Sequence, residues 1–240
     1  MNLMKSITII FAFLGVLFTS CSTGNDPNNN ASSGIVFNSN LTYGTMTDQD
    51  GISYKTIQIG TQTWMAENLR TTKYNDDSAI ANITDKTVWS TLSTGAYCNV
   101  NNTLVNDSIL LFGRYYNWYA VNTGKLAPAG WHLPTYAELT TLSTYLGQTT
   151  AGGKMKETGT LHWKADNTGA TNECGFTAEP GGYIGATGSF ESVGMGAYFW
   201  IKDAYGSQTA WDIYLFYNTA VLTRNFNYKN SGFSVRCIKD

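Results

Sequence analysis

Residues 130–139 read Gly-Trp-His-Leu-Pro-Thr-Tyr-Ala-Glu-Leu, and they contain the clearest helix start in the chain. The hydroxyl of Thr135 stands where it can accept from the third helical amide, and Glu138 stands where it can reach back to the Thr135 amide. Leucines then recur on one helical face, and Gly147 follows as a left-handed stop. We therefore predict a helix of about 11 residues, from Tyr136 to Leu146.

The residues around this helix start are predicted to be structural. Pro134 holds the chain extended into the cap, and Trp131 is expected to be buried against a sheet. Upstream, residues 52–59 have strong β character, and Gly60-Thr61 turns the chain into a second strand that contains Trp64. This pattern predicts a β-hairpin.

The rest of the folded part consists of short segments separated by Gly and Asn turns. Residues 71–110 are polar and lack a sustained period, which predicts a long excursion with short strands. Residues 111–121 have aromatic side chains at helical spacing, so we expect a short helix there. The antiparallel strands predicted after residue 196 are Tyr198–Ile201, Ala210–Phe216, Ala220–Arg224 and Phe233–Ile238. The fold class is therefore α+β, with short-stranded antiparallel sheets, about two helices and long loops.

The composition favours an exported domain rich in β-structure. Of the 240 residues, only 13% are charged and 14% are aromatic, and the formal net charge is −2 at pH 7. These values are typical of secreted, loop-rich domains. The densest basic stretch is Lys154-Met155-Lys156, so we do not expect nucleic acid as a partner.

The N-terminus has the pattern of an export signal. Lys5 is followed by an apolar run at 7–18 that is too short to span a bilayer as a mature helix. The small residues before Cys21 resemble a bacterial lipoprotein processing site, which predicts a signal peptide at 1–20 and acylation of Cys21, for example by palmitate. Two or more acyl chains anchor a protein firmly to a membrane. An ordinary signal peptide with a spare thiol at Cys21 is the alternative.

Residues 21–45 are predicted to be the lipidated cysteine and a flexible tether, because the segment 22–34 has almost nothing to bury. The expected location is the outer membrane or cell surface of a Gram-negative, Bacteroides-type bacterium.

Several motifs along the chain occur in an order typical of one family. They include Asp48-Gln-Asp-Gly51, residues 59–69, Tyr116-Asn-Trp-Tyr-Ala120, residues 130–135, Pro180-Gly-Gly-Tyr183 and Gly232-Phe-Ser-Val-Arg-Cys237. Together they resemble the Fibrobacter succinogenes major paralogous domain, over residues 46–240. The Trp-x-Leu-Pro-Thr-x-x-Glu pattern from Trp131 to Glu138 also resembles the formylglycine-generating enzyme group. The resemblance implies a single C-type-lectin-like domain on a secreted or lipid-anchored surface protein, and it implies no activity.

The cysteines left after acylation of Cys21 are Cys98, Cys174 and Cys237. An odd number in an oxidising compartment predicts one disulfide and one free thiol. Cys174 with Cys237 is the favoured pair, and a pair with Cys98 or three reduced thiols stay open. The two histidines stand in no zinc-ligand spacing with these cysteines, so no metal site is predicted.

The ligand-binding candidates follow the helix in the sequence. Glu179-Pro180-Gly181 and Trp211-Asp212 resemble the elements by which calcium-dependent C-type lectins hold sugars, and Trp200 and Asp203 complete the candidate set. Gly181 offers no side-chain oxygen and no Asn precedes Asp212, so the ligand count for calcium is not met. We therefore predict no cofactor and disfavour calcium.

The expected function is a non-catalytic, lipid-anchored surface domain that binds or presents to an extracellular glycan or protein. No nucleophile elbow or triad is evident, and the carboxylates are too scattered to choose a catalytic pair. One alternative is an enzyme related to the formylglycine-generating oxidases, which requires an open cleft with Cys237 or Cys174 and a metal. The other is a structural subunit of a surface assembly, which requires open strand edges.

Overall fold

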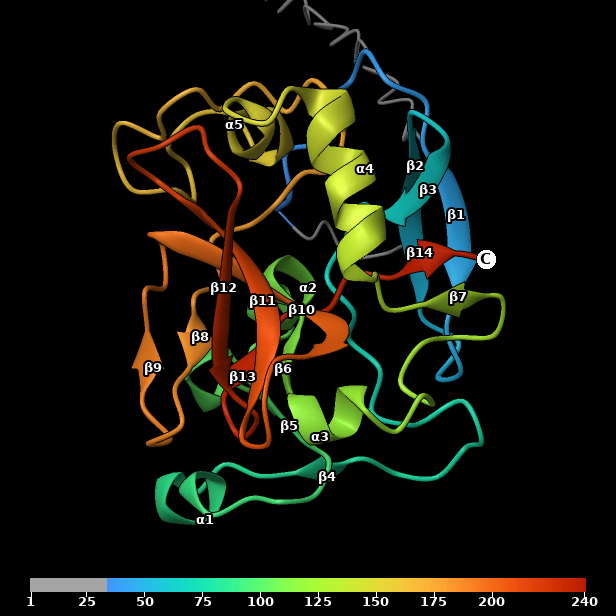
Figure 1. Cartoon of the computed structure of the whole chain (residues 1–240), viewed down its shortest axis with the longest axis vertical. Coiled ribbons are helices and arrows are strands. Elements are labelled where there is room, and N and C mark those ends of the chain that lie inside the picture. Colours follow the sequence, from blue (N-terminus) through green and yellow to red (C-terminus); the bar gives the residue numbers. More distant parts are fainter. Residues whose placement is uncertain (1–33) are drawn as a thin grey trace, which may run out of the picture. The chain divides into compact units, whose positions relative to one another are not determined.

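The computed structural model describes residues 34–240 (Figure 1). The predicted signal peptide, Cys21 and the tether up to residue 33 lie outside the described residues. Among residues 34–240, no helix combines the length and the apolar character needed to cross a membrane.

Three β-sheets form the domain. The first has the order β1-β2-β3-β14-β7 and consists of Gly44–Thr47, Ser53–Ile59, Gln62–Met65, Ile238–Lys239 and Trp131–His132. The second has the order β10-β11-β12 and consists of Gly196–Ala204, Thr209–Phe216 and Thr223–Tyr228. The third has the order β4-β5-β6-β13-β8-β9 and consists of Ala81–Asn82, Ala96–Asn99, Arg114–Asn117, Gly232–Phe233, Tyr183–Ile184 and Phe190–Glu191.

The described helices are α1 (Lys86–Ser90), the 3-10 helix η1 (Val100–Asn102), α2 (Asn106–Phe112), α3 (Trp118–Val121), α4 (Tyr136–Leu146) and α5 (Ala151–Met155). Most are one or two turns long. Neighbouring strands are antiparallel except for β4 and β5, which are parallel. The α+β class is confirmed, although the described residues contain five α-helices where about two were predicted.

Helix α4 begins and ends where the sequence predicted. The Thr135 hydroxyl accepts from the amide of Glu138 at 3.3 Å, and the amide of Thr135 donates to Glu138 Oε2 at 2.8 Å. Gly147 ends the helix with φ at 81°. The buried face of α4 contains Leu139, Leu142 and Leu146, and it packs against strands of both the first and the second sheet (Figure 1). The helix therefore joins two sheets through one core.

The predicted hairpin is confirmed as β2 and β3, which pair in antiparallel register with Ile57 opposite Trp64. Trp64 is fully buried.

The prediction that residues 34–45 belong to the flexible tether is wrong. Phe37, Leu41 and Tyr43 pack against the core beside α4, and β1 already begins at Gly44. The apolar side chains at these three positions explain why the segment packs on the domain.

The single helix predicted at 111–121 is wrong. Helix α2 ends at Phe112, because Gly113 adopts a φ of 70° and lies so close to Asn68 that a Cβ there would be 2.5 Å from the Asn68 Cβ. Residues 114–117 then form β6, and the Asn117 side chain caps the short helix α3 by accepting from the amide of Ala120. Aromatic spacing alone did not distinguish a helix from this strand and cap.

Two of the predicted late strands are also displaced. The Ala220 carbonyl accepts from Gly153 in α5, so residues near 220 form a loop and β12 begins only at Thr223. The segment Phe233–Ile238 divides into β13 and β14, which belong to different sheets. Between them, Arg236 is buried.

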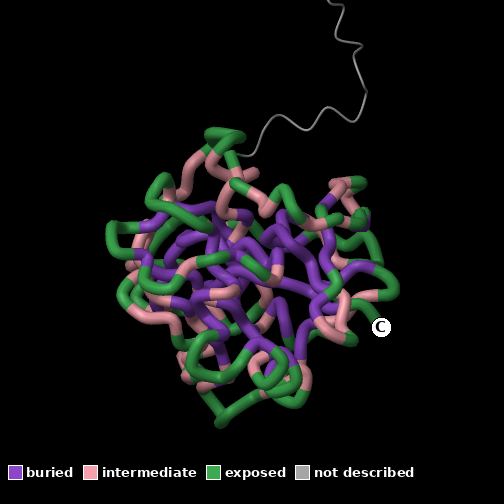
Figure 2. Tube along the Cα trace, turned by 90° about the horizontal axis from the view of Figure 1, so that it is seen from above, coloured by how far each residue is buried: buried purple, intermediate pink, exposed green. Residues whose placement is uncertain are grey.

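The three described cysteines are free thiols. Cys98 and Cys237 are buried in different hydrophobic clusters, and Cys174 packs against the cluster beside α4. The favoured Cys174–Cys237 bridge is therefore not formed, because each sulfur lies in its own part of the core. Figure 2 shows how the buried segments fill the interior beneath the exposed loops.

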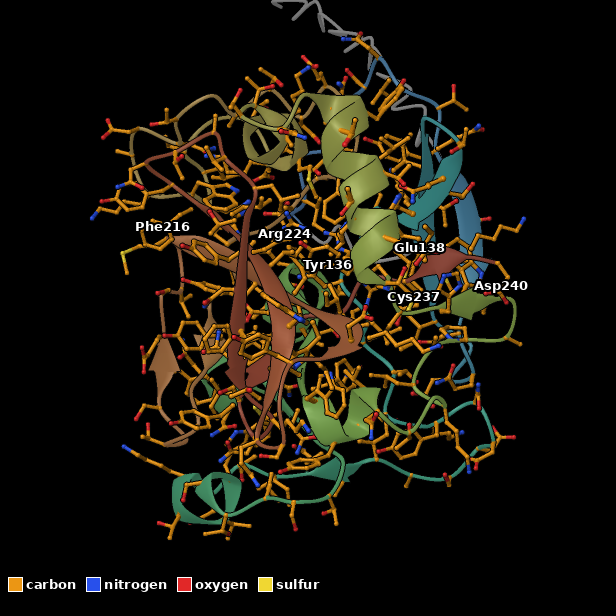
Figure 3. All side chains as sticks on the ribbon, viewed as in Figure 1. Tyr136, Glu138, Phe216, Arg224, Cys237 and Asp240 are labelled. Atoms are coloured by element: carbon orange, nitrogen blue, oxygen red, sulfur yellow. The ribbon has the colours of Figure 1, made fainter. Side chains whose placement is uncertain are left out.

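Trp131 and His132 form the edge strand β7 and are half-buried. Trp131, which was predicted to be buried, is half-buried in β7. His132 lies between two carboxylates, with Nδ1 2.6 Å from Asp240 Oδ1 and Nε2 2.8 Å from Glu138 Oε1. Figure 3 labels Glu138 and Asp240. Burial lowers the pKa of His132, but the hydrogen bonds to Glu138 and Asp240 outweigh it, so the pKa lies above its ordinary value.

The stability contributed by His132 is expected to depend on pH. A histidine whose pKa is raised by folding stabilises the protein fully below its unfolded-state pKa, and this stabilisation is lost as pH rises through the folded-state pKa. The difference in free energy of unfolding between the wild type and His132→Gln should therefore be larger at about pH 5.5 than at about pH 8.5. Urea unfolding at both pH values measures it, and a difference that grows with pH would contradict the expectation.

Candidate ligand-binding surface

Four aromatic side chains form a cluster at the surface where α4 begins. They are Tyr136, Tyr205, Trp211 and Phe226, which we call the aromatic platform. Tyr205 stacks on Phe226 with ring centroids 4.2 Å apart, and the Trp211 ring lies 4.7 Å from Tyr205 and 5.9 Å from Tyr136. Tyr205 is 51% exposed, Phe226 45% and Tyr136 39%. An exposed group of large rings of this kind commonly marks an interaction site.

Local structure explains how these four rings meet. Trp211 in β11 and Phe226 in β12 are directly paired in the antiparallel register, so their side chains lie on the same face of the sheet. Tyr205 follows β10 at the turn toward β11. The carboxylate of Asp203 accepts from the amide of Tyr136 at 2.8 Å and so fastens the start of α4 to the end of β10.

A groove continues from the platform between α4 and β12. Its volume is about 160 Å³, and it is lined by Leu139, Thr140, Ser143, Gln148, Leu222 and Arg224. The Arg224 guanidinium lies 4.2 Å from the centre of the Tyr136 ring, and Figure 3 shows these two side chains where β12 passes the start of α4. Arg224 therefore belongs to both the groove and the edge of the platform.

The chemistry of this surface suits a ligand with a flat apolar face and polar edges. The rings offer stacking area at a low cost in side-chain entropy. The groove adds donors and acceptors from Arg224, Gln148, Thr140 and Ser143. It is smaller than the clefts of about 300–1,000 Å³ that enclose drug-sized ligands. A ligand would therefore lie mainly on the open platform and insert one edge into the groove.

The five ligand-binding candidates from the sequence do not form one site. Trp211 belongs to the platform, and Asp203 positions Tyr136 beneath it. Trp200 is fully buried, and its indole donates to the Tyr116 carbonyl at 2.8 Å. Asp212 is also buried and accepts from Asn227, and burial raises its pKa to about 7.

Glu179, the fifth candidate, lies beside Glu157 and His162. In the described part of the chain, this is the one group of His, Cys, Asp and Glu side chains close enough to hold a metal ion, and it does not contain Asp212. Glu179 and Asp212, which the resemblance to calcium-dependent lectins suggested as ligands of one site, therefore do not belong to one group of potential metal ligands.

Sequence reasoning missed Tyr136, Tyr205, Phe226 and Arg224 as site residues. A signal was present for β12, because Arg224, Phe226 and Tyr228 alternate with Asn residues and point to the exposed side. The sequence pattern marks Tyr136 only as the first residue of a helix.

The structure is that of an α+β domain with a cluster of aromatic side chains at its surface. The chain belongs to the family of the Fibrobacter succinogenes major domain, whose sequence model matches residues 57–239. The match confirms the family that the motifs indicated, and it includes all of the platform and the groove. No curated protein and no solved structure shows a significant match to the chain.

Proposed function

We propose that this chain is a lipid-anchored surface protein whose domain binds an extracellular saccharide on the aromatic platform. The observation that supports the proposal most directly is the surface cluster of four rings, three exposed and Trp211 half-buried, beside a groove whose lining includes polar side chains. The C–H face of a sugar ring stacks on an aromatic ring, and its hydroxyl groups exchange hydrogen bonds with side chains at the edge.

The position of Arg224 supports a saccharide over a flat protein surface. Its guanidinium is held over the Tyr136 ring, where its N–H donors remain available to the groove. Such fixed donors beside a ring match a ligand that presents hydroxyl groups around an apolar face. Three of the rings belong to α4, β11 and β12, and the fourth, that of Tyr205, belongs to the turn between β10 and β11. The surface is therefore largely formed before a ligand binds.

The anchor and the finer fold assignment are parts of the same proposal. Acylation at Cys21 would place the domain at the outer membrane, and the export pattern at 1–20 supports it. The Trp131 to Glu138 motif supports a C-type-lectin-like arrangement, in which a rigid sheet presents variable loops for binding.

The two described cysteines that the oxidase alternative would use, Cys237 and Cys174, do not support it. Cys237 is fully buried, and burial raises its pKa. Burial also raises the pKa of Cys174 to about 11, and its thiol donates to the Lys154 carbonyl at 3.1 Å. A nucleophilic cysteine requires a lowered pKa and access to solvent.

Glycan-array screening of the full-length, detergent-solubilised chain should identify a saccharide, and calorimetry should then give its affinity. Trp211→Ala and Arg224→Gln are each expected to weaken the affinity about tenfold or more, which corresponds to about 1.4 kcal/mol. Trp211 belongs to the platform and Arg224 lines the groove, so both variants remove side chains that the ligand is expected to contact.

Tyr145→Ala is the matched control for this experiment. Tyr145 is also an exposed aromatic residue of α4, but it lines a second groove beside the β2–β3 turn, which shares only Thr140 with the groove at Arg224. Its removal should leave the affinity unchanged. An array without specific binding, or a protein ligand as the only partner recovered, would overturn the saccharide proposal.

A further inference from the structure

The side chains of two buried glutamates, Glu157 and Glu179, and of His162 lie close together in the region that follows α5. The ligand atoms of Glu157, His162 and Glu179 all lie within 4.8 Å of one another. His162 Nδ1 is 2.8 Å from Glu157 Oε2 and 3.5 Å from Glu179 Oε2. Both glutamate side chains are fully buried, whereas His162 is 14% exposed and so connects the cluster to solvent. None of the three residues belongs to the aromatic platform.

The backbone places the two glutamates next to each other. Lys156 and Ala178 form an isolated parallel bridge, and the amide of Glu157 donates to the Ala178 carbonyl at 3.2 Å. Glu157 and Glu179 each follow one member of this bridge, so their carboxylates lie side by side. His162 comes from the loop between them, and its Nδ1 faces both carboxylates.

The hydrogen bonds of this cluster are incomplete. Glu157 accepts from His162 and from the amide of Val36, the latter at 2.7 Å. Glu179, however, has two buried carboxylate oxygens without a hydrogen-bond partner. Burying a carboxylate without partners, next to a second carboxylate, is energetically costly.

The nearest buried guanidinium does not satisfy Glu179. Arg236 interacts with Glu179 only through its charge. Its guanidinium donates hydrogen bonds to four other oxygen atoms, which are Asn68 Oδ1 and the carbonyl oxygens of Met65, Phe176 and Thr177. The cluster thus has two carboxylates, one ring nitrogen and free coordination capacity.

We propose that Glu157, His162 and Glu179 bind one divalent metal ion, with Zn²⁺ as the best fit. Zinc accepts imidazole nitrogen and carboxylate oxygen together, whereas Mg²⁺ and Ca²⁺ prefer oxygen ligands alone. His162 would bind through neutral Nδ1, the atom that faces both glutamates. The two negative charges of the carboxylates would balance the charge of the ion, and the oxygens of Glu179 would gain the partner that they lack.

The metal would also stabilise the position of residues 36–38, because Val36 is hydrogen-bonded to one of the proposed ligands. The amide of Val36 donates to the carboxylate of Glu157, and the side chain of Asn38 donates to the Asn172 carbonyl. An ion that fixes Glu157 should therefore slow amide exchange at Val36. This readout does not depend on any ligand of the platform.

The test is direct metal binding to the full chain after treatment with a chelator. Calorimetry with Zn²⁺ alone should show one equivalent bound, and Ca²⁺ alone should bind at least 100-fold more weakly. Zn²⁺ should raise the melting temperature and slow hydrogen exchange at Val36. Glu179→Gln and His162→Gln should each weaken Zn²⁺ binding at least 100-fold.

Two variants make this outcome decisive. Glu179→Gln removes a buried carboxylate without partners, so the metal-free variant should be at least as stable as the metal-free wild type, and lost binding cannot then reflect unfolding. His132→Gln is the matched control, since His132 also lies between two carboxylates, and it should bind Zn²⁺ like the wild type.

The proposal is overturned if the wild type binds no Zn²⁺, or if Glu179→Gln binds it unchanged. In the first case the two glutamates share a proton instead.

Discussion

Replacing Arg236 with methionine should lower the free energy of unfolding by about 3–5 kcal/mol. The guanidinium is buried, and its N–H groups donate to Asn68 Oδ1 at 2.6 Å, to the Phe176 carbonyl at 2.6 Å and to the Thr177 carbonyl at 2.9 Å. It also lies 4.7 Å from the centre of the Phe176 ring. Methionine would fill part of the space but would leave these buried oxygens unpaired, at about 1–3 kcal/mol each.

Arg236→Lys should lose most of this stability as well. An ammonium group is a point charge and cannot span acceptors arranged around a planar fork. This variant gives a graded measurement if Arg236→Met does not fold. Both are measured by urea unfolding followed by tryptophan fluorescence.

Arg224→Met is the control for the loss of an arginine. Its guanidinium is exposed and contacts the Tyr136 ring, so the change in stability should stay within about 0.5 kcal/mol. An Arg236→Met protein within about 1 kcal/mol of the wild type would contradict the expectation and would mean that water replaces the guanidinium in the core.

The parts of the fold that sequence predicted correctly are those whose partners lie close together in the chain. Thr135 and Glu138 are three residues apart and form the cap of α4. The turn between β2 and β3 at Gly60-Thr61 is equally local, since Ile59 pairs with Gln62 across it. In such cases both partners of a hydrogen bond are visible in one short window of sequence.

The parts that could not be predicted depend on distant contacts. Gly113 ends α2 because Asn68 lies against it, and no pattern within residues 111–121 contains that information. The sequence shows Arg236 only as part of a family motif, because its acceptors belong to segments far away in the sequence. The cluster of Glu157 and Glu179 depends on a single bridge between Lys156 and Ala178.

The candidate site shows the same limit. Trp211 was identified as an aromatic candidate, but its partner Phe226 depends on the register of β11 with β12. Tyr136 joins them only because α4 starts beside the end of β10, where Asp203 accepts from its amide. Sequence could therefore indicate single residues of the platform but not the platform itself.

Gly182→Ala should destabilise the domain by about 2–5 kcal/mol, which combines left-handed backbone strain with overpacking. Gly182 has a φ of 69°, and a Cβ at this position would lie 2.2 Å from the Glu191 carbonyl oxygen and 2.6 Å from the Val193 amide. Both are backbone atoms that cannot rotate away. The amide of Gly182 also donates to the Gly196 carbonyl at 2.8 Å, which ties the start of β8 to β10. Thermal and urea unfolding measure the effect.

Alanine variants of two other glycines distinguish the effect of backbone strain from the effect of overpacking. Gly130 has a φ of 79° with open space around the Cβ position, so Gly130→Ala should show the backbone strain alone, about 1–2 kcal/mol. Gly181 has an ordinary φ, and a Cβ there would lie 3.5 Å from Phe112, so Gly181→Ala should change stability by less than about 0.5 kcal/mol. If Gly182→Ala costs no more than Gly130→Ala, the loop at residues 191–193 yields to the methyl group. If it costs clearly more, the second glycine of the Pro180 to Tyr183 motif is required by close backbone packing between β8, β9 and β10.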